Sequence, residues 1–333
     1  MTVEQFTPYA NGAANRRIAV GLGLAVASAA AFGTSGSFAD TLMTTGWTPG
    51  AVVTVRILVA ALLLTPLALF QLRGRWHRLR GSAGMIGAYG LLAVAGCQLA
   101  FFNAVNHLDV GVALLLEYLG IVLVVLWLWL RHGQRPRRLT IAGIVAAVAG
   151  LVLVLDPSGG LNGVGVAWGM LAATGLAVFF VLSARMDEDL PPLVVAWAGM
   201  VVGSLTLVAS GLTGLLPWHA ATRDVVMFGQ ELSWLVPVVG LSLVAAALSY
   251  SLGVAAARLL GAKVASFVGL TEVLFAVVFA ALLLDQVPTP AQVLGGAVVL
   301  VGVALVQADD RGGAAPVPPA APRITGDHED ALV

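Results

Sequence analysis

Residues 261–306 read GAKVASFVGLTEVLFAVVFAALLLDQVPTPAQVLGGAVVLVGVALV, and this stretch decides the fold. A long apolar run, interrupted only by one serine and by the pair Thr271 and Glu272, leads into the turn DQVPTP and a second apolar run. Pro288 and Pro290 lack the N–H that a continuing helix needs, and each disfavours the helical conformation in the residue before it. The stretch therefore predicts two membrane-spanning helices joined by a tight hairpin, with the ionisable Glu272 near the centre of the first.

The same pattern occurs earlier, in residues 107–155, which read HLDVGVALLLEYLGIVLVVLWLWLRHGQRPRRLTIAGIVAAVAGLVLVL. Glu117 corresponds to Glu272, and the turn at Pro136 corresponds to the turn with two prolines. Each copy also carries two glycines seven residues apart, Gly143 with Gly150 in the first and Gly295 with Gly302 in the second. The chain is therefore internally duplicated, in pattern rather than in register throughout.

The composition places the chain in a membrane. Hydrophobic residues make up 59% and charged residues 10% of it, whereas soluble domains carry about 25% charged residues. A span needs roughly 20 apolar residues, so the chain has room for about ten spans. The spans are helices, because the strands of a membrane barrel would alternate apolar with polar residues. The single cysteine, Cys97, excludes an internal disulfide and a cysteine-based metal cluster.

We predict an all-α integral membrane protein with ten transmembrane helices. The predicted spans are 18–38, 50–70, 84–104, 110–130, 139–155, 163–184, 192–216, 232–257, 262–284 and 290–307. Five spans per half is an odd number, so the two halves, 18–155 and 163–307, enter the membrane in opposite orientations. Inverted repeats of this kind are a transporter architecture with the substrate site near the midplane. The tail, 308–333, is rich in Pro, Ala and Gly and is predicted to be disordered.

The basic residues fall on one side of this arrangement. That side holds Arg16, Arg17, Arg73, Arg75, Arg78, Arg80, Arg131, Arg135, Arg137, Arg138, Arg185, Arg258, Lys263, Arg311 and Arg323. Only Arg223 lies on the other side, and Arg56 lies within a span. Basic residues in short loops stay cytoplasmic, so we expect both termini, including residues 1–17, in the cytoplasm. The apolar run after Arg17 has no signal-peptide cleavage site, so the first span is expected to remain.

These residues carry a resemblance to a known family. The two stretches above and AFGTSGSFA at 31–39 resemble the paired domains of the drug/metabolite transporter superfamily, EamA type, over about residues 18–307. The resemblance implies a ten-span carrier of amino acids, nucleotide sugars, drugs or other small metabolites. VALLLEYLGIVLVVL at 112–126 is also similar to threonine and homoserine exporters. The chain departs from the family pattern at Phe32, where Trp is common, and at Asp285, where Glu is usual.

Three ionisable residues lie within predicted spans: Arg56, Glu117 and Glu272. A charge in a span costs at least about 2.5–3.5 kcal/mol, so each must face the bundle interior or water. Either glutamate could bind a substrate amine or carry a proton in exchange, and Arg56 could bind a carboxylate through its two-pronged guanidinium. The structural alternative is that Arg56 neutralises one glutamate and locks the bundle.

Polar and aromatic residues within spans form a second group of candidates. They are Tyr118, Thr271, Ser35, Gln98, Asn103, Trp168, Trp197 and Tyr250. Such groups can orient a ligand or cover its apolar part. They can equally bond across helices or back to a carbonyl one turn earlier. Tyr118 and Thr271 stand out because each is next to a glutamate.

Enzymatic chemistry finds little support. Ser35 lies in a G-x-S-G sequence typical of an intramembrane serine nucleophile, but all 5 histidines fall in loops, span ends or the tail, so no base is expected near it. The sequence contains no HExxH motif and no phosphate-binding P-loop. The acidic run at Asp187 has no His or Cys nearby. We therefore expect neither catalysis, nor a metal, nor a cofactor.

The sequence as a whole predicts a secondary transporter in the plasma (inner) membrane. It would move a small metabolite, such as an amino acid or a drug-like solute, by alternating access, and the expected direction is outward. Its partners would be that solute and the lipid bilayer, with proton coupling as a hypothesis and no nucleic acid; the choice between monomer and homodimer stays open. Two rivals remain, a non-transporting membrane scaffold or sensor and an intramembrane hydrolase that uses Ser35.

The predicted topology can be tested by labelling introduced cysteines in intact membranes. Arg75→Cys and Arg135→Cys should react with an impermeant thiol reagent from the same face, because both lie in arginine-rich loops. Labelling of the two positions from opposite faces would contradict the ten-span arrangement.

Overall fold

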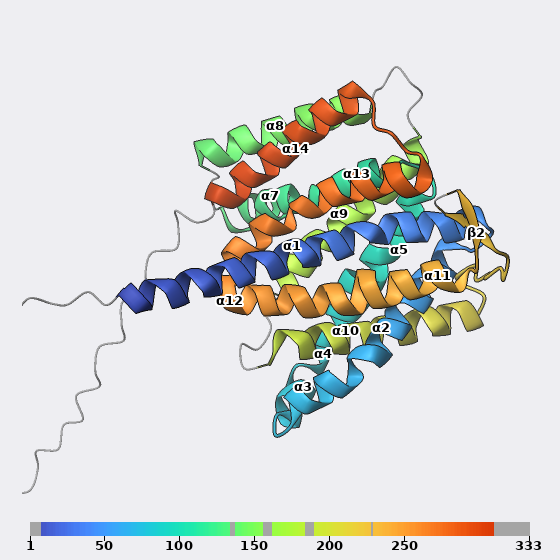
Figure 1. The fold of residues 1–333 in the computed structure, drawn as a ribbon, viewed down its shortest axis with the longest axis horizontal. Coiled ribbons are helices and arrows are strands. Elements are labelled where there is room, and N and C mark those ends of the chain that lie inside the picture. Colours follow the sequence, from blue (N-terminus) through green and yellow to red (C-terminus); the bar gives the residue numbers. More distant parts are fainter. Residues whose placement is uncertain (1–7, 134–136, 156–161, 184–189, 228, 310–333) are drawn as a thin grey trace, which may run out of the picture.

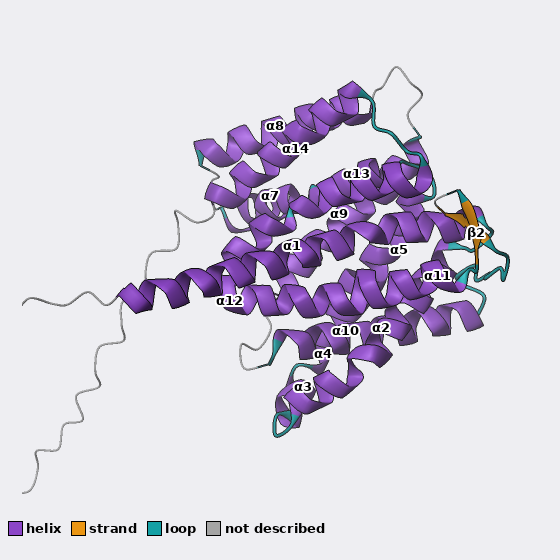
Figure 2. Cartoon of the chain, in the orientation of Figure 1, coloured by secondary structure: helices purple, strands orange, loops and turns teal. Residues whose placement is uncertain are grey.

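The structure, a computed structural model, describes residues 8–133, 137–155, 162–183, 190–227 and 229–309 and consists almost wholly of helices (Figures 1 and 2). Among these residues, 8 helices are long and apolar enough to cross a membrane. Two further apolar helices, Thr271–Leu284 and Pro290–Val306, are shorter. The chain therefore has the helices of a multi-pass membrane protein.

The first half of the chain contains α1 (Pro8–Thr44), α2 (Pro49–Leu72), the short α3 (Trp76–Gly81), α4 (Ala83–Ala88), the π-helical η1 (Tyr89–Gly96), α5 (Cys97–Val105), α6 (Val110–Tyr118), α7 (Gly120–His132) and α8 (Arg138–Leu155). Of these, α4, η1 and α5 form one continuous helix from Ala83 to Val105. A single residue, Leu119, separates α6 from α7.

The second half contains α9 (Gly163–Ser183), α10 (Pro192–Leu212), β1 (Val225–Met227), β2 (Gln230–Leu232), α11 (Leu235–Val239), the π-helical η3 (Gly240–Leu248), α12 (Ser249–Gly269), α13 (Thr271–Leu284) and α14 (Pro290–Asp309). The two strands form an antiparallel hairpin in which Val225 pairs with Leu232. A single residue, Leu270, separates α12 from α13.

The structure corrects several predicted boundaries. The first helix is longer than 18–38, the helix predicted at 192–216 ends at Leu212, and α3 was not predicted. The helix predicted to start at 232 starts at Leu235, because the preceding residues pair in the hairpin.

The prediction of a connection between 257 and 262 was wrong. Helix α12 runs without interruption to Gly269, and the helix is interrupted at the single residue Leu270. Glu272 therefore lies in the first turn of α13 and not near the centre of a long helix. Both one-residue breaks adjoin a glycine, Gly120 or Gly269, and glycine weakens a helix by roughly 0.5–1 kcal/mol.

Some predictions fall outside the described residues. These are Pro136, Arg135, Arg185, the run at Asp187, Arg311, Arg323 and the tail beyond Asp309, together with the side chains of Arg258 and Lys263.

Local sequence explains where several helices begin and end. Pro49 opens α2, and the Thr48 hydroxyl accepts a hydrogen bond from the amide of Ala51. Before α14, Thr289 and Gln292 form a reciprocal capping pair: the Thr289 amide donates to the Gln292 side chain at 2.8 Å, and the Gln292 amide donates to the Thr289 hydroxyl at 3.2 Å. Asp285 ends α13 in the left-handed conformation, at φ 55°. The hairpin expected around the two prolines is thus fixed at both ends.

Helix α1 runs through the middle of the bundle, between α12 and α13 (Figure 1). It approaches α13 closely because it has no side chain at Gly33, where a Cβ atom would lie 2.9 Å from the backbone nitrogen of Ala276. Helices α8 and α14 lie side by side along one edge (Figure 1).

The two glycine pairs meet in this α8–α14 contact. A Cβ atom on Gly143 would lie 2.6 Å from the carbonyl oxygen of Gly302, and one on Gly150 would lie 2.6 Å from that of Gly295. Small residues allow membrane helices to pack backbone against backbone. The seven-residue interval seen in the sequence is therefore the spacing of two contact points on antiparallel helices.

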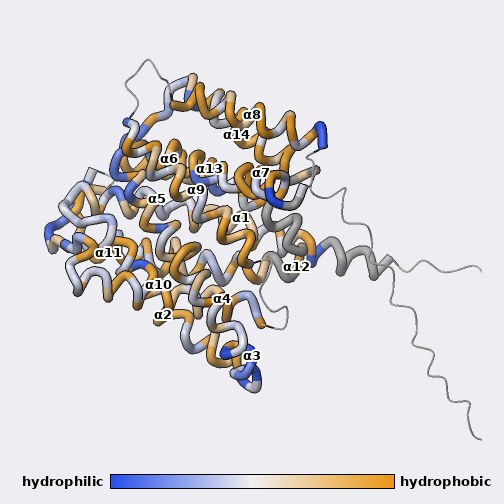
Figure 3. Tube along the Cα trace, turned by 180° about the vertical axis from the view of Figure 1, so that it is seen from behind, coloured by the Kyte–Doolittle hydropathy of each residue, from blue (hydrophilic) through white to orange (hydrophobic). Residues whose placement is uncertain are grey.

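Polar residues collect at the ends of the bundle. Figure 3 shows hydrophobic residues along the bodies of α8 and α14 and hydrophilic residues at α3. The first residues of α1 and the last residues of α14 lie at the same end of the bundle (Figure 1). This distribution is the one expected for helices that traverse lipid.

A single methyl group should loosen the α8–α14 contact. Gly302→Ala would place its Cβ 2.5 Å from the amide nitrogen of Ala147, so the helices must separate. We expect the free energy of unfolding to fall by about 1–3 kcal/mol. The melting temperature of the detergent-purified protein should fall with it. Gly23→Ala is the matched control, because a Cβ there meets no atom within 4 Å. Equal melting temperatures for the two variants would contradict this account of the contact.

Candidate functional site

The two helix breaks each have a glutamate beside them. Glu117 lies two residues before the break at Leu119, and Glu272 lies two residues after the break at Leu270. Leu119 and Leu270 both keep a right-handed helical conformation, so each interruption is a local irregularity of one residue. Irregular positions within membrane helices line binding sites in many transporters. The breaks therefore mark where a polar site can be built inside an apolar bundle.

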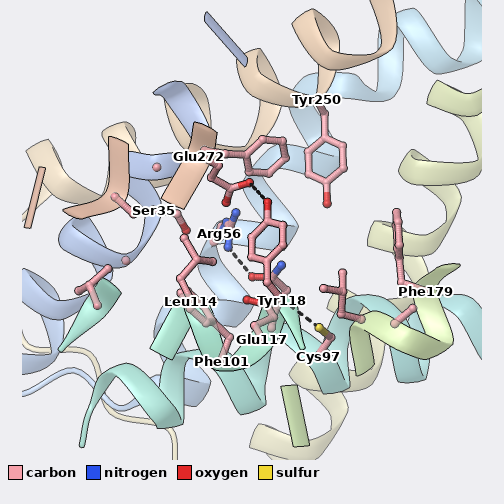
Figure 4. Close-up of a pocket in the computed structure, with 18 of the residues that line it drawn as sticks. Ser35, Arg56, Cys97, Phe101, Leu114, Glu117, Tyr118, Phe179, Tyr250 and Glu272 are labelled. Carbon is pink, nitrogen blue, oxygen red and sulfur yellow. Dashed lines mark hydrogen bonds between the residues drawn. The ribbon is translucent and has the colours of Figure 1, made fainter. Parts of the chain in front are cut away.

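A cavity of about 270 Å³ lies between these breaks. Its wall is formed by α1, α2, η1, α5, α6, α9, α12 and α13. Seven of the residues predicted from sequence line it: Ser35, Arg56, Gln98, Glu117, Tyr118, Tyr250 and Glu272. Figure 4 shows Arg56, Glu117 and Glu272 pointing toward the same space. Residues from both halves of the chain thus contribute to one site.

Each carboxylate has its own hydrogen-bond donor. The Cys97 thiol donates to Glu117 Oε1 at 3.3 Å, and the Tyr118 hydroxyl donates to Glu272 Oε2 at 3.0 Å (Figure 4). The Tyr118 hydroxyl also lies 3.4 Å from the carbonyl oxygen of Gly269, which is a second acceptor for the same proton. Tyr118, which directly precedes the first break, therefore contacts residues on both sides of the second break, Gly269 and Glu272.

Arg56 is buried, at 4% exposure, and is held by neutral groups. Its Nη1 donates to the side-chain oxygen of Gln98, and its Nη2 donates to the carbonyl oxygen of Ala245 at 3.3 Å. Its guanidinium carbon lies 5.4 Å from the centre of the Phe102 ring, a cation–π contact. In the described part of the chain, neither glutamate is among its hydrogen-bond partners, so neutral acceptors and not a direct ion pair orient the guanidinium.

Ser35 presents an unsatisfied hydroxyl to the cavity. Its side chain is 6% exposed, and its Oγ has no hydrogen-bond partner among the residues that the structure describes. A buried hydroxyl without a partner costs about 1–3 kcal/mol, which a ligand atom could recover. Gly33, Gly36 and Phe32 on the same helix also line the cavity, so α1 contributes backbone, an aromatic ring and this hydroxyl to its wall.

Aromatic side chains form an apolar part of the wall. The rings of Phe32 and Tyr250 meet edge to face at 4.9 Å, and those of Phe179 and Phe180 do so at 5.4 Å. All four residues line the cavity. The site therefore combines one cation, two carboxyl groups, a free hydroxyl and an aromatic surface.

Four predicted candidates do not line this cavity. The Thr271 hydroxyl donates to the carbonyl oxygen of Val268 at 2.6 Å, and the Asn103 amide donates to that of Leu99 at 2.7 Å. The Trp197 ring N–H donates to the Thr65 hydroxyl at 2.9 Å and so ties α10 to α2. Trp168 packs against the hydrophobic core. These groups make the structural contacts that were the alternative to ligand binding.

Other lining residues were not predicted as site residues. They are Phe32, Gly33, Gly36, Ala93, Cys97, Phe101, Val110, Leu114, Leu176, Phe179, Phe180 and Ala276. Most are apolar, and an apolar residue looks the same in sequence whether it faces a cavity or lipid. Cys97 could have been noticed, because it precedes the predicted Gln98 directly.

The described residues offer little for metal or hydrolytic chemistry. No group of three His, Cys, Asp or Glu side chains among them could hold a metal ion. The described residues that line the cavity include no histidine that could act as a base for Ser35. The polar groups are suited to binding and releasing a charged solute.

Comparisons with known proteins agree with this architecture. The chain is 24% identical over 67% of its length to an uncharacterized inner membrane transporter, YicL, of Salmonella typhimurium, 72% of which is covered. It is 27% identical over 66% of its length to an uncharacterized transporter of Archaeoglobus fulgidus, 73% of which is covered.

A solved structure described only as "Crystal structure of protein" has a similar fold. The two chains superpose with a TM-score of 0.52 at 17% identity, covering 91% of this chain and 99% of the other. A sequence model of the EamA-like transporter family matches residues 19–156 and again residues 163–308. Because these two matches include nearly all of the helical bundle, the chain belongs to the EamA-like transporter family.

Proposed function

We propose that this protein is a secondary transporter that moves a small zwitterionic metabolite across the plasma membrane by alternating access, with the cavity between the two helix breaks as its substrate site. The observation that carries the proposal is the meeting of Arg56, Glu117 and Glu272 in one cavity. A guanidinium and two carboxyl groups are costly to place within an apolar bundle, and ionisable groups in membrane spans often mark a substrate or ion pathway.

The proposed scaffold is ten spans in two inverted five-helix repeats, 18–155 and 163–307. The two family matches support it, as do the breaks beside Glu117 and Glu272. The π-helical η1 and η3 also occur at corresponding places, in the third helix of each half. In this scheme the end of α12 and α13 together form the ninth span, and both termini are cytoplasmic.

The charges of the cavity favour an amino acid over a neutral solute. Arg56 can bind a carboxylate through the donors that Gln98 and Ala245 leave free. The glutamates can bind an ammonium group, and the Ser35 hydroxyl supplies one further hydrogen bond. The rings of Phe179 and Phe180 would cover an apolar side chain. Export is the proposed direction.

Proton exchange is the proposed coupling. A carboxyl group that binds either a proton or the substrate ammonium links the two movements, because one must leave before the other binds. Glu272 is suited to this role, since its partner Tyr118 has a second acceptor in Gly269 and keeps a hydrogen bond when Glu272 changes state.

Removing one carboxylate charge should abolish most transport. The proposed amino-acid substrates are first sought by comparing the medium of cells with and without the protein, and those that accumulate are then assayed in proteoliposomes. Glu117→Gln and Glu272→Gln should each lower the flux about tenfold or more, the effect of losing one charge-assisted hydrogen bond. A proton-sensitive dye inside the vesicles should show loss of substrate-driven proton movement.

Glu231→Gln is the matched control, because Glu231 is an exposed carboxylate in β2, away from the cavity. Its flux should equal that of the unaltered protein. Unchanged flux in both cavity variants would refute a role for the glutamates. Absence of any flux in the unaltered protein would instead favour a scaffold or sensor.

The chain also carries its own reporter of cavity occupancy. Cys97 is the only cysteine and lines the cavity, so any labelling by a small thiol reagent reports access to the site. A transported amino acid should slow the labelling in proportion to its concentration, and Cys97→Ser should abolish it. If the solute is transported but leaves the labelling rate unchanged, it binds elsewhere.

A further inference from the structure

A second cavity lies behind the helices that carry the two glutamates. It has a volume of about 480 Å³ and lies between α6, α13 and α14, with Val154 of α8 also in its wall. Its walls include Leu115 of α6, Val277 of α13 and Leu300 of α14. We refer to it as the α6–α13–α14 groove.

The groove is apolar along its length and polar at one end. Its polar lining residues lie together at this end: Asp109 directly precedes α6, Gln286 is in the connection between α13 and α14, and Gln292 is in the first turn of α14. The Gln292 amide donates to Asp109 Oδ2 at 3.3 Å, and the Gln286 side-chain oxygen accepts from the amide of Val110 at 3.1 Å. This end is tied together by hydrogen bonds, while the body of the groove offers only apolar side chains.

Side chains at the rim of the groove are exposed on the outer surface of the bundle. Leu274, Val278 and Val293 line the groove and are 55%, 51% and 57% exposed. In a protein that spans a membrane, such side chains face lipid rather than water. An occupant can therefore enter sideways from the bilayer.

We propose that the α6–α13–α14 groove is a binding site for one phospholipid with an ammonium headgroup, such as phosphatidylethanolamine. An acyl chain lies in the apolar body, and the headgroup lies at the polar end. Asp109 is the single ionisable residue among the described residues that line the groove, and it is exposed. A carboxylate attracts an ammonium group and repels the phosphate of an anionic lipid, so the charge at the mouth selects the headgroup.

The site is placed to act on the transport machinery. On α6, Leu114 and Glu117 line the central cavity, whereas Leu115 lines the groove. On α13, Glu272 lines the cavity, whereas Val273 lines the groove. The lipid chain therefore packs against the rear of both helices that carry the carboxyl groups.

Native mass spectrometry of the detergent-purified protein tests the site directly. The probes are phosphatidylethanolamine and phosphatidylglycerol with identical acyl chains, so that only the headgroup differs. The unaltered protein should retain one phosphatidylethanolamine, with a preference of about five-fold over phosphatidylglycerol. Asp109→Asn should remove the preference while both lipids still bind.

A second variant tests the body of the groove. Ala297→Phe places a ring within it and should lower lipid retention about tenfold. Val301→Phe is the matched control, because Val301 is 56% exposed on the same helix but does not line the groove. Its lipid retention should be unchanged.

Three results would overturn the proposal. Equal retention of the two lipids by the unaltered protein would show that the retained lipid is bound without headgroup selection. Equal lipid retention by the two phenylalanine variants would show that the retained lipid does not lie in the groove. A dimer mass that Ala297→Phe converts to a monomer, with lipid retention intact, would show that a second copy covers the groove. Because lipid binding is measured without a transport assay, its failure is distinct from failure of the proposed function.

Discussion

Hydrocarbon cannot solvate a charge, and this constraint shapes the whole bundle. Arg56, Glu117 and Glu272 lie on predominantly apolar helices that carry no other charged residue, so each must find polar partners within the protein. The structure supplies an amide and a carbonyl for the arginine, a thiol for one glutamate and a phenol for the other. All three charged groups converge on one small cavity, which limits the polar volume that the bundle must enclose.

The donors come from elements far apart in sequence, so the polar site also holds the fold together. Tyr118 reaches from α6 to Glu272 on α13, and Arg56 reaches from α2 to Ala245 in η3. Close approach is needed for such short bonds, and small residues permit it: Gly33 lets α1 contact α13, and Gly120 lets α7 contact α9. The glycines and the ionisable residues are two parts of one arrangement.

Sequence reasoning succeeded where one physical rule dominates. Charges must avoid lipid, so Arg56, Glu117 and Glu272 could be expected in the interior, and apolar length gave most of the helices. It failed where packing decides which position interrupts a helix and which apolar side chain faces the cavity instead of lipid. Gly269 weakens the helix beside Leu270, but Gly33 and Gly36 lie within an uninterrupted helix, so a glycine alone does not locate the break. Phe179 could as well have faced lipid. Asn103 and Trp197 were singled out by residue type, but Asn103 bonds to a carbonyl of its own helix and Trp197 bonds to the Thr65 hydroxyl of a neighbouring helix.

The antiparallel glycine contacts of α8 and α14 restrict how the molecule can move. In each helix two glycines contact the backbone of the other helix. If α8 shifted along α14 by one residue, a side chain would take the place of a glycine and clash with a backbone carbonyl of the partner. Helix α8 belongs to the first family match and α14 to the second. The two halves are thus joined along this edge by backbone contacts whose register is fixed, so a rearrangement of the bundle that slid α8 along α14 would be resisted here.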